Sequence, residues 1–293
     1  MRVLLVDVDS KIPNLALMKI SAWHKAQEDE VGFAIENPDK VYISCIFTRN
    51  AAQAKGIAKF YPEAIIDIGG SGVDLKKTLI REIELMKPDY DLYPSSYSQG
   101  YTTRGCIREC EFCIVPIKEG WINEDQHPSE FHDDRFDTCM IMDNNLFAAP
   151  QYWQDKVFDW FIKNKIKMLS PQGWDIRLLT QQRVEQLKSV KHTGIIHFAW
   201  DNIKDEKAVL RGIKLLKDSG FDLKRGVSFY VLAGFQSDFE DALYRCEHLK
   251  ELGTQSFVMP YHKKDKRINE LARWANRPWL YWSIPFSKYK VPS

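Results

Sequence analysis

Three of the chain's six cysteines fall within eight positions, in the segment GCIRECEFC. Cys106, Cys110 and Cys113 have the spacing Cys-x3-Cys-x2-Cys and directly follow a β-rich run. Three thiolates on one loop suit a cubane [4Fe–4S] cluster, in which the protein holds three irons and leaves the fourth open to a small molecule. The alternatives are a structural zinc site completed by His127 or His132, or three unconnected core thiols. The spacing therefore predicts a metal centre built by a single loop.

The composition narrows the class of protein that carries this loop. The chain has 293 residues, of which 44% are hydrophobic and 28% charged, and its formal net charge is +1. Such a length can bury one large core, or a large core and a small one. A nearly neutral chain has no overall electrostatic preference for nucleic acid or for an acidic membrane.

We expect no membrane or export segment. The opening MRVLLVDVDSK has a short apolar run interrupted by two aspartates, which is typical of a strand and not of a signal peptide. No apolar stretch reaches the length needed to span a bilayer. The sequence therefore predicts a cytoplasmic protein, in which thiols stay reduced and clustered cysteines bind metal more often than they form disulfides.

The N-terminal third of the chain is expected to form a separate small domain. Residues 1–90 alternate β-rich runs with amphipathic segments, which predicts a small Rossmann-like α/β domain. Asn50 is expected to cap the second helix. We expect strands at 2–8, 40–47 and 64–70, and helices at 14–27, 50–61 and 74–87.

The alternation continues in longer units over residues 91–262, with strands about thirty residues apart, the size of a βαβ unit. Six such units predict an α/β fold with a partial (β/α)6 parallel barrel, whose strands end on one ligand-binding face. Residues 263–293 are expected to form a C-terminal helix and tail. Their mixed cations and aromatics leave nucleic-acid contact as the alternative to a packed amphipathic helix. Expected strands are 101–105, 137–143, 167–171, 194–200, 226–234 and 255–261; expected helices are 152–164, 180–189, 206–220 and 238–253.

The cysteine segment resembles the cluster motif of the radical S-adenosylmethionine (radical SAM) superfamily, including the aromatic Phe112 before the third cysteine. The continuation CIVPIKEG is similar in particular to methylthiotransferases and to cobalamin-binding-type members, and the similarity runs from about residue 100 to 262. The resemblance implies a [4Fe–4S] cluster whose open iron is chelated by SAM. Reductive cleavage then gives a 5′-deoxyadenosyl radical that abstracts hydrogen from a substrate. It also implies a one-electron donor such as flavodoxin or ferredoxin.

Polar side chains at the expected strand ends are candidates for holding SAM. Asp143, Asn144 and Asn145 follow the second strand, where their oxygens can accept hydrogen bonds from the SAM ammonium; a helix N-cap is the alternative. Gln172 and Arg177 follow the third strand. Arg177 suits either a carboxylate of SAM or substrate, or an exposed salt bridge.

The later strand ends match the family less well. Relatives often have a Glu-Ser pair after the fourth strand, where this chain has Asp201, so ribose contact by Asp201 is a partial carry-over. Arg211 stands near the position of a carboxylate-binding basic residue. The resemblance implies adenine contacts from Ala233 and Gly234, and from the backbone of Phe112 and Ile114.

The N-terminal domain looks like a degenerate relative of a cobalamin-binding domain. Cobalamin binding through an axial histidine is not expected, because residues 1–90 lack the Asp-x-His-x-x-Gly signature and their sole histidine, His24, lies in a predicted helix. Methylthiolation is disfavoured, because Cys45 alone cannot hold a second cluster. The expected substrate is a small molecule, a nucleotide or a nucleic-acid base. The alternatives are an enzyme that matures a peptide or protein, and a non-catalytic iron–sulfur or zinc module.

Overall fold

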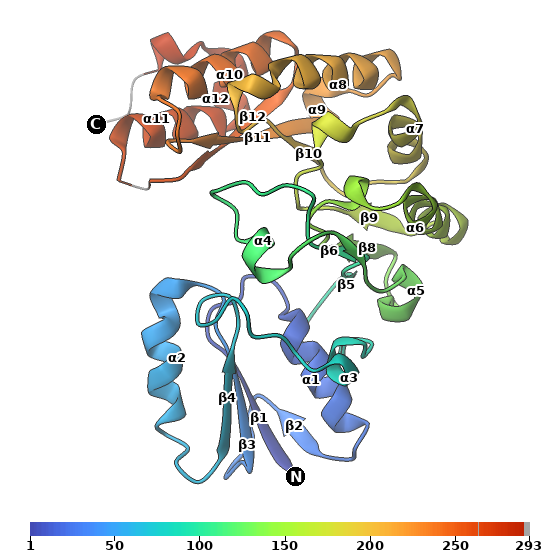
Figure 1. Ribbon diagram of the computed structural model, residues 1–293, viewed down its shortest axis with the longest axis vertical. Helices are drawn as coiled ribbons and strands as arrows, with labels where there is room; N and C mark the ends of the chain where they lie inside the picture. Colours follow the sequence, from blue (N-terminus) through green and yellow to red (C-terminus); the bar gives the residue numbers. More distant parts are fainter. Residues whose placement is uncertain (263, 290–293) are drawn as a thin grey trace.

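The computed structural model describes residues 1–262 and 264–289 and confirms the expected α/β class, with parallel sheets and helices packed against them (Figure 1). The N-terminal strands form one four-stranded parallel sheet in the order β2-β1-β3-β4. The central strands are continuous apolar runs, as expected where both faces of a sheet are covered. The bounds are β1 (Arg2–Asp7), β2 (Glu30–Gly32), β3 (Lys40–Ser44) and β4 (Ile65–Gly69).

Alternate residues of β1 pack on opposite faces of this sheet, because side chains alternate along a strand. Val3 belongs to a buried cluster with Leu17 of α1, and Leu4 belongs to another with Ala54 of α2. One helix therefore covers each face. The bounds are α1 (Leu15–Lys25), α2 (Ala51–Ala58) and α3 (Arg81–Glu84).

Three expectations for this domain were wrong in detail. The Asn50 side chain does not cap α2; its Nδ2 donates instead to Asp9 Oδ2 at 2.8 Å. The helix expected over residues 74–87 is reduced to the single turn of α3. Its first part is held against β4, where Lys77 Nζ donates to Ile68 O at 2.7 Å. β2 was missed because three residues of mixed polarity carry no strand pattern.

Six further parallel strands form two three-stranded sheets, β5-β8-β9 and β10-β11-β12. Two isolated parallel bridges, Met168 with His192 and Trp174 with Phe198, connect the segments around β9 and β10. The first strand comes earlier than expected: β5 ends at Gly100, and part of 101–105 is instead β6, which pairs antiparallel with β7. The bounds are β5 (Ser98–Gly100), β6 (Thr103–Arg104), β7 (Asn123–Glu124), β8 (Thr138–Ile141), β9 (Lys167–Leu169), β10 (Ile196–Ala199), β11 (Val227–Ala233) and β12 (Gln255–Pro260).

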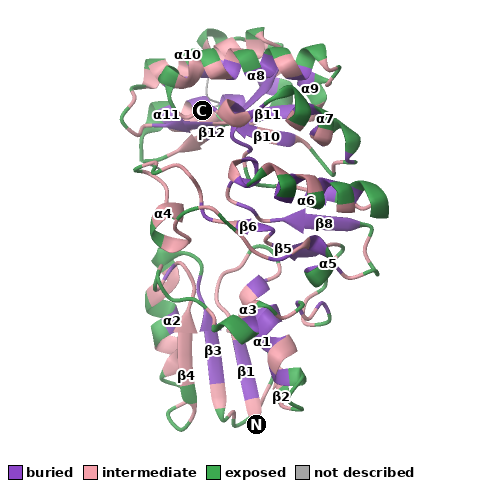
Figure 2. Ribbon diagram, turned by 45° about the vertical axis from the view of Figure 1, so that its right-hand side comes forward, coloured by how far each residue is buried: buried purple, intermediate pink, exposed green. Residues whose placement is uncertain are grey.

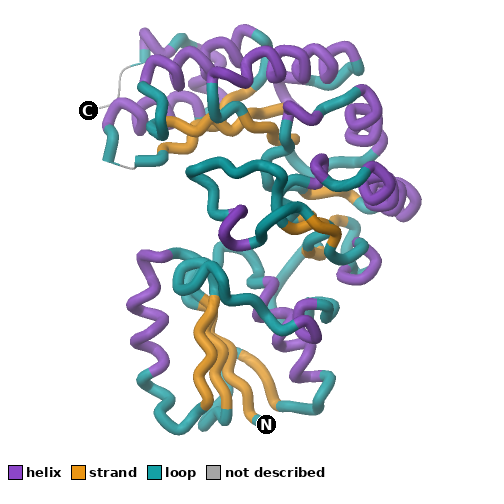
Figure 3. Tube along the Cα trace, viewed as in Figure 1, coloured by secondary structure: helices purple, strands orange, loops and turns teal. Residues whose placement is uncertain are grey.

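Helices follow these strands and lie on the outer side of the two sheets (Figure 3). None of the described helices is long and apolar enough to cross a membrane. The bounds are α4 (Val115–Lys118), α5 (Pro128–Phe131), α6 (Gln151–Asn164), α7 (Gln181–Ser189), α8 (Glu206–Asp218), α9 (Leu223–Gly226), α10 (Phe239–Glu251), α11 (Lys266–Ala275) and α12 (Pro278–Ser283), with 3-10 turns η1 (Thr48–Asn50), η2 (Leu146–Ala148), η3 (Ile176–Leu178), η4 (Ile203–Asp205) and η5 (Phe286–Lys288).

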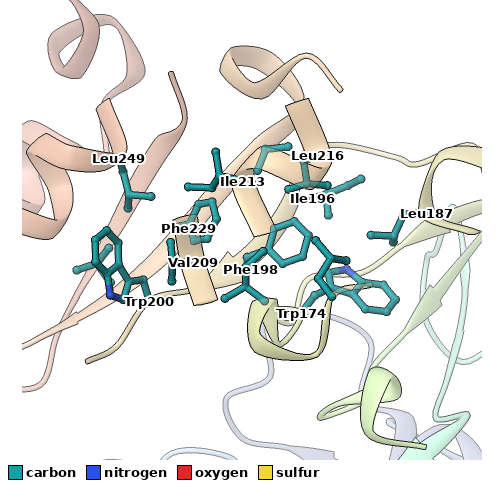
Figure 4. Close-up of a cluster of buried hydrophobic side chains, with 14 of the residues drawn as sticks. Trp174, Leu187, Ile196, Phe198, Trp200, Val209, Ile213, Leu216, Phe229 and Leu249 are labelled. Carbon is teal, nitrogen blue, oxygen red and sulfur yellow. The ribbon is translucent and has the colours of Figure 1, made fainter. Parts of the chain in front are cut away.

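One apolar cluster joins the outer faces of these sheets to the helices (Figure 4). Phe198 and Phe229 project from β10 and β11 toward Ile213 of α8, and all three are buried. The same cluster contains Leu271 and Trp274, so α11 packs inward as an ordinary amphipathic helix, and the described C-terminal segment shares the core of the larger domain. Strands β8 and β11 are accordingly almost entirely buried (Figure 2).

A buried ionic network joins the N-terminal domain to the larger one. Lys19 of α1 is 1% exposed, and its Nζ donates to Glu84 Oε1 at 3.1 Å and to Gln126 Oε1 at 2.9 Å. Arg104 of β6 pairs with the same Glu84 and with Asp125 Oδ2 at 2.7 Å. Because buried charges need partners, this network favours one fixed arrangement of α1 and α3 against the segment that leads into the cysteines.

Candidate functional site

The three cysteines lie on the loop between β6 and α4. Gly105 opens this loop with φ +82°, and a Cβ there would lie 2.4 Å from Trp121 O, so the close return of the chain requires glycine. Cys106 N closes the loop by donating to Gly120 O at 3.2 Å. The loop therefore begins and ends at one narrow neck with the cysteines between, as the sequence predicted.

The three thiols are free, half-buried and electrostatically coupled. Burial raises the pKa of Cys110, as does the negative charge of Cys113 and Cys106, while the Arg177 guanidinium lowers it. Two sulfurs also accept backbone hydrogen bonds, Cys106 Sγ from Arg108 N at 3.3 Å and Cys113 Sγ from Val115 N at 3.5 Å. Such N–H donors stabilise a thiolate, the form that binds iron.

The described residues contain no group of three or more His, Cys, Asp or Glu side chains gathered around a single metal ion. The histidines of the zinc alternative lie elsewhere. His127 and His132 each contact Trp160 of α6, with ring centroids 6.4 and 5.1 Å apart, on the side of the domain that carries α5 (Figure 1).

Asp143 follows β8 and is fully engaged within the protein. Its carboxylate accepts hydrogen bonds from Thr102 N at 2.6 Å, from the Thr102 hydroxyl and from Thr103 Oγ1 at 2.8 Å. Burial raises the pKa of Asp143 to about 6, against the opposing effect of these donors. The structure therefore places Asp143 as a tie between β8 and the start of the cysteine loop, and not as a free acceptor for an ammonium group.

The two asparagines after Asp143 reach the cysteine loop itself. Asn144 Oδ1 accepts from Gly105 N at 3.0 Å, and Asn145 Nδ2 donates to Cys106 Sγ at 3.4 Å. Asn145 is 6% exposed and its Oδ1 has no hydrogen-bond partner, which is costly for a buried amide oxygen. Both asparagines line a cavity of about 10 Å³ together with Gln172. Of the three polar residues predicted at this strand end, Asn145 is thus the candidate hydrogen-bond acceptor for a ligand.

An arginine pair lies on the other side of the cysteines. Asp175, 7% exposed, accepts from Arg108 Nε at 3.0 Å and from Arg177 Nε at 2.7 Å. Burial works to raise the pKa of Asp175, but the two guanidinium groups hold it below its usual value. Arg211, by contrast, is exposed on α8 and donates to Arg177 O at 2.8 Å. The structure therefore brings Arg177 to the site and leaves Arg211 outside it.

The ends of β10 and β11 meet beside Asp201, whose Oδ1 accepts from Leu232 N at 3.1 Å. Burial raises the pKa of Asp201. The sequence analysis missed Arg245 of α10, which is 0% exposed and donates to Trp200 O at 2.6 Å and to Leu232 O at 2.9 Å. The available signal was a charged residue on the apolar face of a helix, three positions after the buried Ala242.

Two contacts hold the cysteine loop against the turn that follows β11. Phe112 contacts Phe235, with ring centroids 5.6 Å apart, and Gln236 Nε2 donates to Glu111 Oε2 at 2.6 Å. Gly234, at φ +83°, starts this turn, and a Cβ there would lie 2.7 Å from a methyl group of Ile268. Phe112 and the turn that includes Gly234 are thus neighbours, while Ile114 is 48% exposed; that these residues contact adenine stays a prediction. No sequence pattern indicated that Phe235 and Gln236 contact the cysteine loop.

No protein-family model matches the chain, and no curated protein matches it in sequence. Among solved structures, the radical S-adenosylmethionine methyltransferase TsrM from Kitasatospora setae, determined with cobalamin and a [4Fe–4S] cluster bound, is similar in fold. The TM-score is 0.63 at 11% sequence identity, over 88% of this chain and 74% of that one. The likeness covers more than the larger domain alone. It shows that the chain shares the fold of a radical SAM enzyme, which is the fold that the cysteine motif predicted.

Proposed function

We propose that the protein is a radical SAM enzyme that cleaves S-adenosylmethionine reductively at a [4Fe–4S] cluster. The observation that carries the proposal is the cysteine loop, with three free thiols held between one narrow neck and the ends of β8 and β11. Its coincidence with the fold of a known radical SAM enzyme makes an accidental cluster of thiols a poor explanation. We interpret the six parallel strands as a partial (β/α)6 barrel over residues 91–262, with the small α/β domain of residues 1–90 in front.

The residues present fit the cofactors. Cys106, Cys110 and Cys113 would each bind one iron, helped by the amide donors to two of the sulfurs. When bound, the cluster supplies the electron that cleaves the sulfonium and releases a 5′-deoxyadenosyl radical for hydrogen abstraction. The Arg177 guanidinium opposes the effect of burial on the pKa of Cys110 and so favours its thiolate.

SAM would lie across the strand ends. Asn145 Oδ1, buried and unpartnered, would accept a hydrogen bond from the methionine ammonium, while Arg177 would face the carboxylate. Asp201, at the ends of β10 and β11, would accept hydrogen bonds from ribose hydroxyls. The turn that begins at Gly234 would approach adenine opposite Phe112. These groups orient the ligand and keep water away, and the cofactors carry the bond cleavage.

Cobalamin is not part of this proposal, although the TsrM structure contains it. His24 cannot serve as an axial ligand, because it is 1% exposed and its ring nitrogens contact Asp29 Oδ2 at 2.7 Å and Tyr42 Oη at 3.2 Å. At the carboxyl end of the N-terminal sheet, a Cβ on Gly70 would lie 2.3 Å from Cys45 O, so the segments that follow β3 and β4 approach each other closely there. Incubation with hydroxocobalamin followed by gel filtration tests this point, and a retained corrinoid spectrum would overturn it.

The substrate is proposed to be a small molecule, a nucleotide or a nucleic-acid base in the cytoplasm, with flavodoxin or ferredoxin as electron donor. Maturation of a peptide remains the alternative for the same chemistry. Neither comes from the TsrM likeness, which concerns the fold. Retention on nucleic acid that falls steeply with salt would identify the nucleic-acid branch.

The decisive experiment is anaerobic reconstitution followed by iron and sulfide analysis and reduction with dithionite in the presence of SAM. We expect four irons per chain and formation of 5′-deoxyadenosine. Cys110→Ala should lose both, while Cys45→Ala, a matched change outside the loop, should retain both. A cluster that never cleaves SAM would support the non-catalytic iron–sulfur module, and a single zinc would refute the cluster.

A further inference from the structure

The sheet β10-β11-β12 has one face that its helices do not cover. Phe198 and Phe229 point toward α8 and α10 in the apolar cluster (Figure 4). Side chains alternate along a strand, so the residues next to Phe198 in β10 and next to Phe229 in β11 lie on the opposite face of the sheet. We call this opposite face the inner face. His197, Tyr230 and Phe257 occupy this inner face on β10, β11 and β12.

The inner face carries a connected set of rings. His197 stacks on Tyr230 with centroids 4.7 Å apart and an interplanar angle of 12°, and Tyr230 meets Phe257 edge-to-face at 5.8 Å. Phe257 is nevertheless 39% exposed, although it lies in the middle of a strand of the larger domain. Aromatic side chains that merely fill a core are covered on all sides, so this set ends in an open ring.

Tyr230 is fixed in place from the far side. Its hydroxyl donates to Pro171 O at 2.8 Å, in the segment that follows β9. Gly173 makes room for the ring, because a Cβ at that position would lie 3.0 Å from Tyr230 Cδ2, closer than most real contacts. The rings therefore form a rigid surface, which lowers the ordering cost of binding a flat ligand.

Polar groups without partners accompany the rings. Ser228 is aligned with His197 across β10 and β11, and with Gln255 across β11 and β12. Ser228 is 1% exposed, and neither its Oγ nor His197 Nδ1 has a hydrogen-bond partner among the described residues. Burial lowers the pKa of His197, which keeps the imidazole neutral and able both to donate and to accept. Buried polar atoms usually have partners, and here two that lack one lie on aligned residues of neighbouring strands.

We propose that the inner face binds a planar aromatic ring of the substrate, with a polar edge of that ring turned toward Ser228 and His197. This inference rests on the proposed function and names the substrate class for the same domain. The ring would lie deeper in the domain than the carboxyl ends of the strands, because Tyr230 comes before Ala233 and Gly234 along β11 and the turn that follows it. The substrate would thus lie deeper in the domain than the adenine of SAM.

Benzamide and cyclohexanecarboxamide provide a matched pair of probes, because they share a neutral amide and differ only in the planarity of the ring. Binding of each to the full-length protein is measured by ligand-observed saturation-transfer NMR, with titration for affinity. We expect benzamide to bind about three- to tenfold more tightly than the saturated analogue, the advantage typical of an aromatic contact. Phe257→Leu should remove this advantage, and Tyr230→Leu should do the same where the variant folds.

Tyr152→Leu is the control, since Tyr152 is an aromatic residue 53% exposed on α6, away from the sheet. It should leave benzamide affinity unchanged. Equal binding of the two probes, or loss of benzamide binding in Tyr152→Leu alone, would refute the proposal. S-adenosylhomocysteine should not displace benzamide; displacement would assign the rings to adenine and overturn the assignment to substrate. None of these measurements requires SAM cleavage, so a missing 5′-deoxyadenosine signal would count against the proposed function and not against this site.

Discussion

Replacing Arg245 with methionine tests how the ends of β10 and β11 are held. The guanidinium is fully buried and donates to Trp200 O and Leu232 O, the carbonyls just before the turn to Asp201 and beside Ala233. Methionine fills similar space but leaves both carbonyls without a donor, at about 1–3 kcal/mol each. Burial lowers the pKa of Arg245, so holding its charge inside the protein is costly. Removing the buried charge therefore offsets part of the destabilisation caused by the two unpaired carbonyls.

We expect Arg245→Met to lower the free energy of unfolding by about 2–4 kcal/mol, measured by urea denaturation with the slope unchanged. SAM affinity of the reconstituted protein should fall by about tenfold, equal to about 1.4 kcal/mol, because Asp201 and the turn at Gly234 lose their fixed positions. The iron content should stay at the wild-type level, since Arg245 donates to Trp200 O and Leu232 O and not to the neck of the cysteine loop, which Cys106 N closes on Gly120 O.

Arg225→Met is the matched control, because Arg225 is exposed and its recorded hydrogen bond uses only the backbone N–H. It should change stability by no more than about 0.5 kcal/mol. An Arg245→Met protein as stable as wild type, with unchanged SAM affinity, would show that water or backbone adjustment satisfies the two carbonyls. The assignment of Arg245 as the residue that positions these strand ends would then be wrong.

Two further substitutions address the other buried charges. Burial raises the pKa of Asp143 from 3.8 to about 6, so the folded protein holds the Asp143 proton more tightly than the unfolded chain does. Wild-type stability should therefore fall by on the order of 3 kcal/mol as the pH rises through this interval. Asp143→Asn should flatten that fall in urea titrations at several pH values, and parallel profiles for the two proteins would contradict the assignment. Lys19→Met removes the buried donor to Glu84 and Gln126, although Arg104 still pairs with Glu84, and should cost about 2–4 kcal/mol, with faster proteolysis between the two domains. Lys25→Met, which breaks only the half-exposed pair with Asp89, should cost less than about 1 kcal/mol, and equal losses in both variants would show that burial of Lys19 is unimportant.

Features that depend on neighbouring residues could be predicted from the sequence. The spacing of Cys106, Cys110 and Cys113 is a property of one short loop, and strand–helix alternation is a local pattern of hydrophobicity. The structure accordingly confirms the parallel α/β class and the overall order of the main elements. The first strand of the larger domain was misplaced because the Tyr and Thr residues of YTTRG have higher β propensity than the SQG of β5. Only its pairing with β7 shows that part of it forms a hairpin.

The roles of individual polar residues depended on contacts that no local pattern contains. Asp143 and Asn145 stand two positions apart, yet Thr102 and Thr103 satisfy the first, and the second keeps an unpaired Oδ1 beside Cys106. Arg245 supports strand ends formed 45 and 13 residues earlier in the chain. Local sequence was enough to predict the three-cysteine loop and the alternation of strands and helices, because both are properties of neighbouring residues. The tertiary structure alone decided which polar atoms are consumed by neighbours and which stay available, because hydrogen-bond satisfaction depends on distance in space and not on separation along the chain.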